Sequence, residues 1–221
     1  MAYTLKIQQI LPLTHDVKQI KVEKPEGYSF ISGQATDVSI NKKEWKDEKR
    51  PFSFTSLPED KQLEFVIKSY RDHPGVTNQI DKLAVGDELI IDDAWGAIQY
   101  KGKGVFIAGG AGVTPFIGII KFLQSKGELA GNRLFFANKT AKDVILESYF
   151  RDLLGSDFIS ILAKEEVSGH EFGMIDKAFL KNHIQDFSQK FYVCGPDPMV
   201  KAISASLKEL GANPEEIVFE K

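Results

Sequence analysis

Residues 104–127, GVFIAGGAGVTPFIGIIKFLQSKG, decide how the second half of this chain is expected to fold. The segment starts with a short apolar run typical of a buried strand. It then passes through closely spaced glycines and continues with apolar residues at helical spacing. Thr114 is expected to cap this helix, Pro115 to be its first residue and Gly127 to end it. A strand, a tight turn and a helix in this order predict the start of a parallel α/β domain.

The rest of the second half repeats the alternation of strand and helix. Buried-strand patterns follow at RLFFANK, DFISILAKE, KFYVCGP and EIVFEK, and helical patterns lie near residues 143–154, 176–185 and 197–210. Strands that alternate with helices predict a parallel sheet covered on both faces, which is a doubly wound domain. We place this domain at residues 104–221.

The first half has a different pattern. Up to about residue 100 it consists of short extended runs, such as YTLKIQQILPL, TDVSI and QLEFVIKSY, with turn residues between them. One helical pattern, GVTNQIDKLAVG, interrupts these runs. Many short strands at this spacing predict an antiparallel barrel or sandwich over residues 1–100, with a hinge at YKGKG, residues 100–104.

Composition excludes several classes of protein. The 221 residues are 43% hydrophobic and 27% charged, with a formal net charge of −3, as in ordinary globular proteins. No cluster of Lys and Arg provides a nucleic-acid footprint, so we expect no nucleic-acid partner. The N-terminus lacks a signal-peptide core, and glycines and a proline break the longest apolar stretch. We therefore expect no membrane insertion and a cytoplasmic location.

Metal chemistry is not expected either. The single cysteine, Cys194, excludes an internal disulfide and a cysteine-ligated iron–sulfur or zinc site within these residues. The four histidines, at positions 15, 73, 170 and 183, show no ligand spacing. We expect no bound metal, and any redox chemistry then needs an organic cofactor.

The glycine-rich turn is a candidate phosphate site. Gly110 and Gly112 would let the backbone approach a phosphate, and the following helix start supplies amide groups and a positive dipole end. The alternative is a tight turn without a ligand. Pro115 stands where the usual dinucleotide fingerprint has a third glycine or alanine.

Gly-Gly-x-Gly-x-Thr-Pro after a strand resembles the nucleotide motif of the ferredoxin–NADP reductase superfamily. RPFSFTS (50–56) resembles that family's flavin signature Arg-x-Tyr-Ser-x-x-Ser, with Phe52 in place of tyrosine. CGPDPM (194–199) is similar to its Cys-Gly-Pro-x-x-Met element, and IVFEK (217–221) to its closing strand with a glutamate. ANKT (137–140) followed by DVIL resembles the NADH-using cytochrome b5 reductase branch. The motifs follow the family's order and cover nearly the whole chain.

The resemblance implies an antiparallel flavin-binding barrel followed by a nucleotide-binding domain. It implies FAD as the cofactor, with FMN as the alternative, and NADH or NADPH as the hydride donor. The catalytic residues it implies are Ser53, Cys194 and Glu220. The flavin contacts it implies are Arg50, Pro51, Phe52, Ser53, Val66, Ile67, Lys68, Gly75, Val76 and Thr77. The nucleotide contacts it implies are Gly110, Gly112, Thr114, Pro115, Asn138, Lys139, Cys194, Gly195, Pro196 and Met199.

The implied activity is hydride transfer from NAD(P)H to the flavin, followed by electron transfer to a separate acceptor. Such an acceptor would be a ferredoxin, a flavodoxin or an oxygenase component. Two alternatives stay open. The first is a reductase of free flavin or another small molecule, and the second is a non-catalytic flavin- or nucleotide-binding subunit of an electron-transfer complex.

Overall fold

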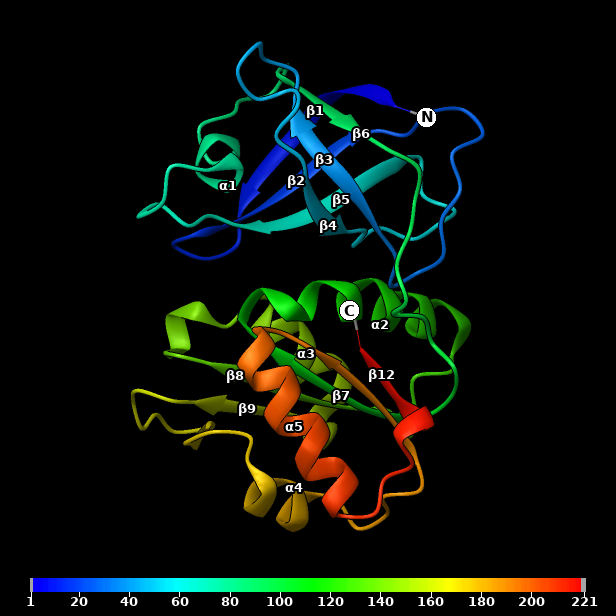
Figure 1. The fold of residues 1–221 in the computed structure, drawn as a ribbon, viewed down its shortest axis with the longest axis vertical. Coiled ribbons are helices and arrows are strands. Elements are labelled where there is room, and N and C mark those ends of the chain that lie inside the picture. Colours follow the sequence, from blue (N-terminus) through cyan, green and yellow to red (C-terminus); the bar gives the residue numbers. More distant parts are fainter. Residues whose placement is uncertain (1, 220–221) are drawn as a thin grey trace. The chain divides into compact units, whose positions relative to one another are not determined.

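The computed structural model describes residues 2–219, which form two compact units (Figure 1). The first unit contains the residues up to Gln99 together with Thr114–Lys126. The second contains Tyr100–Val113 and the residues from Gly127 onward. The domain boundary expected at 100–104 stays a prediction, because this grouping follows packing and not independent folding. Within residues 2–219, no helix is both long and apolar enough to cross a membrane.

The first unit is an antiparallel β-barrel. Its strands are β1 (Tyr3–Pro12), β2 (Val17–Glu23), β3 (Ala35–Ile40), β4 (Arg50–Ser53), β5 (Gln62–Lys68) and β6 (Glu88–Ile91). They are ordered β4-β3-β6-β1-β2-β5, and every neighbouring pair is antiparallel. A bridge between Phe54 and Phe65 joins the two ends of this order, so the sheet nearly closes. The prediction of a barrel is confirmed.

Alternating side chains fill the barrel. In β1, Leu5 and Ile7 are buried while the residues beside them are exposed, as expected for a strand with one wet face. Phe54 lies at the centre, stacked on Phe30 with ring centroids 4.2 Å apart. The short helix α1 (Val76–Ile80) packs its first and last residues into the same core. The core therefore anchors β4, β5 and α1, the elements that carry the predicted flavin contacts.

Helix α2 (Thr114–Lys126) groups with the barrel although β7, the strand before it, does not. The chain enters α2 through a 3-10 turn, Gly110–Val113. Thr114 is therefore the first helical residue and not the N-cap that the sequence predicted. The helix ends where expected, because Gly127 adopts a φ of +69°, which an L side chain rarely takes.

The second unit is built on a parallel sheet. Its strands are β7 (Gly104–Gly109), β8 (Arg133–Asn138), β9 (Phe158–Leu162), β10 (Glu171–Phe172), β11 (Lys190–Cys194) and β12 (Ile217–Phe219). They are ordered β10-β9-β8-β7-β11-β12, and all pairs are parallel. The direction of this order reverses at β7, which makes the carboxyl end of β7 the topological switch point. The two-residue strand β10 was not predicted.

Helices cover both faces of this sheet. Helices α4 (Lys177–His183) and α5 (Asp197–Glu209) pack on one face, where their apolar side chains join those of the central strands in one buried cluster (Figure 1). Helix α3 (Glu147–Leu154) lies on the opposite face, where its Phe150 meets Phe136 of β8 edge to face. The prediction of a doubly wound domain is confirmed.

Tyr192 ties the start of the second unit to its sheet. The buried ring stacks on Phe106, with centroids 4.6 Å apart. Its hydroxyl donates to the carbonyl of Gly102 at 2.7 Å and accepts from the amide of Lys101 at 2.8 Å. Burial raises the pKa of Tyr192 to about 12. The expected hinge segment is thus fastened at its middle by one phenol group.

We expect Tyr192→Phe to lower the free energy of unfolding by about 1–3 kcal/mol, because a donor and an acceptor lose their partner. Urea titration with Tyr70→Phe as the control measures this, since the Tyr70 ring is half exposed. The difference in the free energy of unfolding between variant and wild type should become smaller as the pH rises from 10 to about 12. The lower value is the ordinary pKa of tyrosine and the upper one is the raised pKa of Tyr192. The folded state holds the phenolic proton longer there, so rising pH removes its stabilisation. Equal unfolding curves at neutral pH would contradict this role.

Candidate functional site

The glycine-rich turn and the Cys194 turn meet at the switch point. Cys194 pairs with Ala108 at the carboxyl ends of β11 and β7. A Cβ atom placed on Gly112 would lie 2.3 Å from the carbonyl oxygen of Cys194, which is backbone and cannot move aside. Only glycine permits this approach. Two motifs that are far apart in the sequence therefore form one surface of backbone groups.

The CGPDPM segment packs directly on β7. A Cβ atom on Gly109 would lie 2.3 Å from the sulfur of Met199 and 3.1 Å from Cδ of Pro196. Pro196 also starts α5, since its carbonyl accepts from the amide of Met199 at 2.9 Å. The predicted nucleotide contacts of this motif thus lie against the strand that leads into Gly110.

Asn138 has a buried side-chain amide without a hydrogen-bond partner in the part of the chain that the structure describes. It is the last residue of β8, the strand beside β7, and only 8% of its surface is exposed. Neither the nitrogen nor the oxygen of its side chain has a hydrogen-bond partner within residues 2–219. An unpaired buried amide costs about 1–3 kcal/mol, so it needs an explanation such as a ligand. Lys139, the next residue, is exposed.

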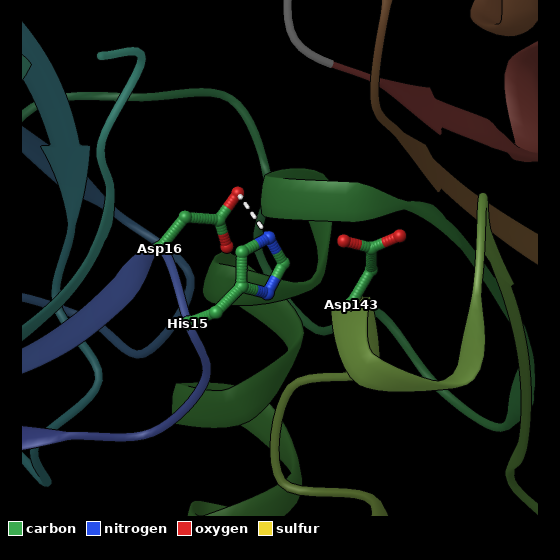
Figure 2. Close-up of side chains that lie close together, drawn as sticks. All are labelled: His15, Asp16 and Asp143. Atoms are coloured by element: carbon green, nitrogen blue, oxygen red, sulfur yellow. Dashed lines mark ion pairs between the residues drawn. The ribbon is translucent and has the colours of Figure 1, made fainter.

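The turn after β8 is braced by two carboxylates. The amide and hydroxyl groups of Thr140 donate to Asp143 at 2.9 and 2.6 Å, and Figure 2 shows the Asp143 side chain. The carboxylate of Glu165, which follows β9, accepts from the amide of Ala141 at 2.5 Å. Glu165 was not among the residues predicted from the sequence. The available signal was an acidic pair, Glu165 and Glu166, that begins three residues after the end of a buried strand.

Strand β4 places the flavin-signature residues along one edge of the barrel. Arg50 is exposed, and one of its guanidinium nitrogens lies 3.7 Å from a carboxylate oxygen of Glu48. This ion pair is long, so the guanidinium group can still bind a phosphate. Pro51 is exposed and Phe52 packs its ring partly against the core. Ser53 is 9% exposed and pairs with Ala35 of β3. The pattern leaves a cation at one end of the strand and a hydroxyl at the other.

Strand β5 carries three of the predicted flavin contacts. The side chains of Val66 and Ile67 are buried, so only their backbone groups remain for a flavin. Lys68 forms an ion pair with Asp16 at 3.0 Å. The carboxylate of Asp16 also lies 3.6 Å from Nε2 of His15, as Figure 2 shows. Lys68 is therefore held by an acidic partner and does not project as a free charge.

The start of α1 supplies backbone donors. Gly75 precedes the helix in an extended conformation. The Val76 side chain lies in the barrel core, so its backbone amide is the group left to face a ligand. The first amides of a helix lack intrahelical acceptors and suit an anion. Thr77 accepts from the amide of Tyr70 at 3.5 Å. Glu220, the third predicted catalytic residue, lies outside the described residues.

Two family models match the chain in the same order as the two motif sets. Residues 2–92 match an FAD-binding domain, and residues 106–205 match an oxidoreductase NAD-binding domain. These matches assign FAD and a nicotinamide nucleotide as the cofactors. The residues present fit them: Arg50 and the α1 amides suit a diphosphate, while the glycine cradle and the unpartnered Asn138 suit a dinucleotide.

Curated relatives are reductases. The reductase component of propane 2-monooxygenase from Rhodococcus jostii is 27% identical over 98% of this chain and 62% of the relative. NADH-cytochrome b5 reductase 2 from Mycosarcoma maydis is 29% identical over 96% of this chain and 66% of the relative. The chain thus spans about two thirds of the length of these relatives. A ferredoxin NADP+ reductase from Neisseria gonorrhoeae, solved with FAD and NADP, has the same fold, with a TM-score of 0.87, 20% identity and coverage of 99% and 98%.

We expect Gly112→Ala to abolish nucleotide binding, because its methyl group would overlap the Cys194 carbonyl and push the two turns apart. Gly155→Ala is the matched control, because Gly155 has a similar φ of +54° and leads into the amino end of β9, away from the two turns. Its Cβ would meet nothing within 4 Å, so the substitution should lower the free energy of unfolding by only about 1 kcal/mol. Calorimetric titration with NADH measures both variants, and circular dichroism confirms that each is folded. Undiminished binding by Gly112→Ala would show that this contact does not shape a nucleotide site.

Proposed function

Because this chain belongs to the ferredoxin–NADP reductase superfamily, we propose that it is an FAD-dependent oxidoreductase that oxidises a nicotinamide nucleotide and passes the electrons to a separate acceptor. The observation that carries this proposal is the backbone contact between the Gly112 and Cys194 turns at the switch point. Open α/β sheets bind their ligands at this position. We further propose residues 1–100 as the flavin domain and residues 104–221 as the nucleotide domain.

On this proposal the second unit binds and orients the nucleotide. The amides of the Gly110–Val113 turn, and that of Thr114 directly after it, hold the diphosphate. The buried side-chain amide of Asn138 hydrogen-bonds the nucleotide, which removes the free-energy cost of leaving that amide unpaired. Cys194, Gly195, Pro196 and Met199 form the wall that fits the nicotinamide. Tight packing at this wall matters because hydride transfer needs close and aligned reactants.

The first unit holds the flavin. Arg50 and the amides of Gly75–Thr77 neutralise its diphosphate, Phe52 covers part of the ring, and Ser53 donates a hydrogen bond at its reactive edge. When bound, the flavin accepts a hydride and can release electrons one or two at a time. The backbone of Val66 and Ile67 lies along it and excludes water. The Lys68 ammonium group forms an ion pair with Asp16, so Lys68 would line the flavin site without adding an unpaired positive charge to it.

The acceptor is proposed from the relatives. The reductase component of propane 2-monooxygenase favours an oxygenase component, and a ferredoxin or a flavodoxin would serve the same chemistry. NADH-cytochrome b5 reductase 2 is named for another protein acceptor, and a reductase of free flavin or another small molecule is the alternative. A cytoplasmic location stays a prediction.

We expect the purified protein to carry non-covalent FAD, whose visible absorbance bleaches on anaerobic titration with NADH. Arg50→Ala should weaken FAD binding about ten- to a hundredfold, because it removes a charge-assisted contact with phosphate. Lys43→Ala, which removes a nearby exposed charge, is the control. Released flavin is identified by chromatography after heating. A protein that neither contains nor takes up FAD, or whose FAD is not reduced by either nucleotide, would disprove the proposed function.

We also expect NADH to be preferred to NADPH. Glu165 is fixed beside the turn that follows β8, where its charge would repel a 2′-phosphate. Lys139 is exposed, so its attraction is screened, and Lys139→Ala should change kcat/KM for NADPH by no more than about fivefold. Glu165→Gln should narrow the preference. Steady-state kinetics with both nucleotides decide this. A tenfold advantage for NADPH that Lys139→Ala abolishes would reverse the assignment.

A further inference from the structure

A buried ion pair joins α2 to the barrel within the first unit. The ammonium group of Lys121 lies 2.7 Å from Oε1 of Glu64 on β5. The same group donates to the carbonyl of Thr55 at 2.8 Å, and the Thr55 hydroxyl donates to Oε1 of Glu64 at 2.8 Å. Only 8% of the Glu64 side chain and 26% of the Lys121 side chain are exposed. The Lys121 ammonium group therefore has two close acceptors, and the other carboxylate oxygen of Glu64 lies 3.9 Å from Nζ of Lys21.

The pair sits on the end of the flavin-signature segment. Thr55 and Ser56 are the last residues of RPFSFTS, and both are buried. The Thr55 amide donates to the Glu64 carbonyl at 2.8 Å, and the Glu64 amide donates to the Ser56 hydroxyl at 3.2 Å. These polar groups are engaged with β5. The segment thus has two parts: residues 50 and 51 are exposed, and residues 54–56 are buried and attach the segment to β5.

Gly118 brings the helix backbone onto the same segment. A Cβ atom there would lie 2.6 Å from the carbonyl oxygen of Phe54. Gly118 and Lys121 are three residues apart and so share one face of α2. The helix therefore rests directly on Phe54 at one turn and is tied to Thr55 at the next.

We propose that Lys121, Glu64 and Thr55 form a positioning device that fixes α2 to the flavin-binding segment. The device sets where Thr114 and Pro115, the residues at the nucleotide end of α2, lie relative to Ser53. This inference rests on the proposed function. Lys121 is a positioning residue, since it acts through the helix and touches neither cofactor. A displacement of about 1 Å at the reacting atoms costs about a hundredfold in rate, so such a tie controls hydride transfer.

The first test needs no cofactor. Hydrogen–deuterium exchange of the flavin-free protein compares wild type with Lys121→Met, which keeps most of the side chain and removes its charge. Amides of residues 114–126 should exchange about tenfold faster in the variant, because an attached helix opens less often than a loose one. Amides of α5 should not change. Lys126→Met removes an exposed charge from the last turn of the same helix and is the control.

The second test measures hydride transfer. In FAD-loaded protein, the limiting rate of flavin reduction by NADH in stopped flow should fall about ten- to a hundredfold in Lys121→Met, whereas the dissociation constants of FAD and NADH should change by less than about threefold. Lys121→Arg should restore most of the rate. The double variant Lys121→Met, Glu64→Gln leaves no uncompensated buried charge, so it guards against simple unfolding. It should regain thermal stability while reduction stays slow.

The outcomes separate this inference from the proposed function. Wild-type protein that binds no FAD, or is not reduced by NADH, disproves the proposed function and with it the inference. If wild type is reduced and Lys121→Met is reduced equally fast, the positioning device is disproved and the proposed function stands. The same holds if the rate recovers together with stability in the double variant, because Lys121 is then only a structural residue.

Discussion

The structure depends on the approach of two backbone turns at the carboxyl ends of β7 and β11. Gly112 and Cys194 come so close that no side chain fits between them. This contact forms because β7 and β11 are paired neighbours, and because the strand order reverses at β7. The amide groups of both turns consequently lie together at the one edge of the sheet where an open α/β fold leaves room for a ligand.

Buried polar groups in the two units are arranged in different ways. Asn138 is buried with an unpaired side chain, which has a cost in the free protein and suits a bound nucleotide. Lys121 and Glu64 are also largely buried, but they satisfy each other and Thr55. Asn138 therefore has hydrogen-bonding capacity left for a ligand, whereas Lys121 and Glu64 use theirs to attach a helix. Both kinds are polar and buried, and only their hydrogen bonds tell them apart.

Much of the fold was predictable because local patterns were strong. Alternation in β1 and the fully apolar β7 identified the two strand types, and Gly127 ended α2 where expected. Thr114 was wrongly expected as a cap, because the 3-10 turn Gly110–Val113 runs directly into α2 and makes Thr114 the first helical residue. The strand β10 was missed because two exposed residues carry no periodicity. The Val76 contact with the flavin stays a prediction for its backbone amide, because its side chain belongs to the barrel core.

The sequence by itself determined the two kinds of strand, alternating in the first half and fully apolar in the second, and the turn at Gly110–Val113. It also determined which residue types are available for an anion and for an aromatic cofactor. These features depend on neighbours along the chain. Only the tertiary structure decided which of those residues meet. It placed Cys194 against Gly112, left Asn138 without a partner, and engaged Thr55 and Ser56 with Glu64. The reason is physical: burial and hydrogen-bond partners are properties of contacts between distant segments, and a linear pattern does not contain them.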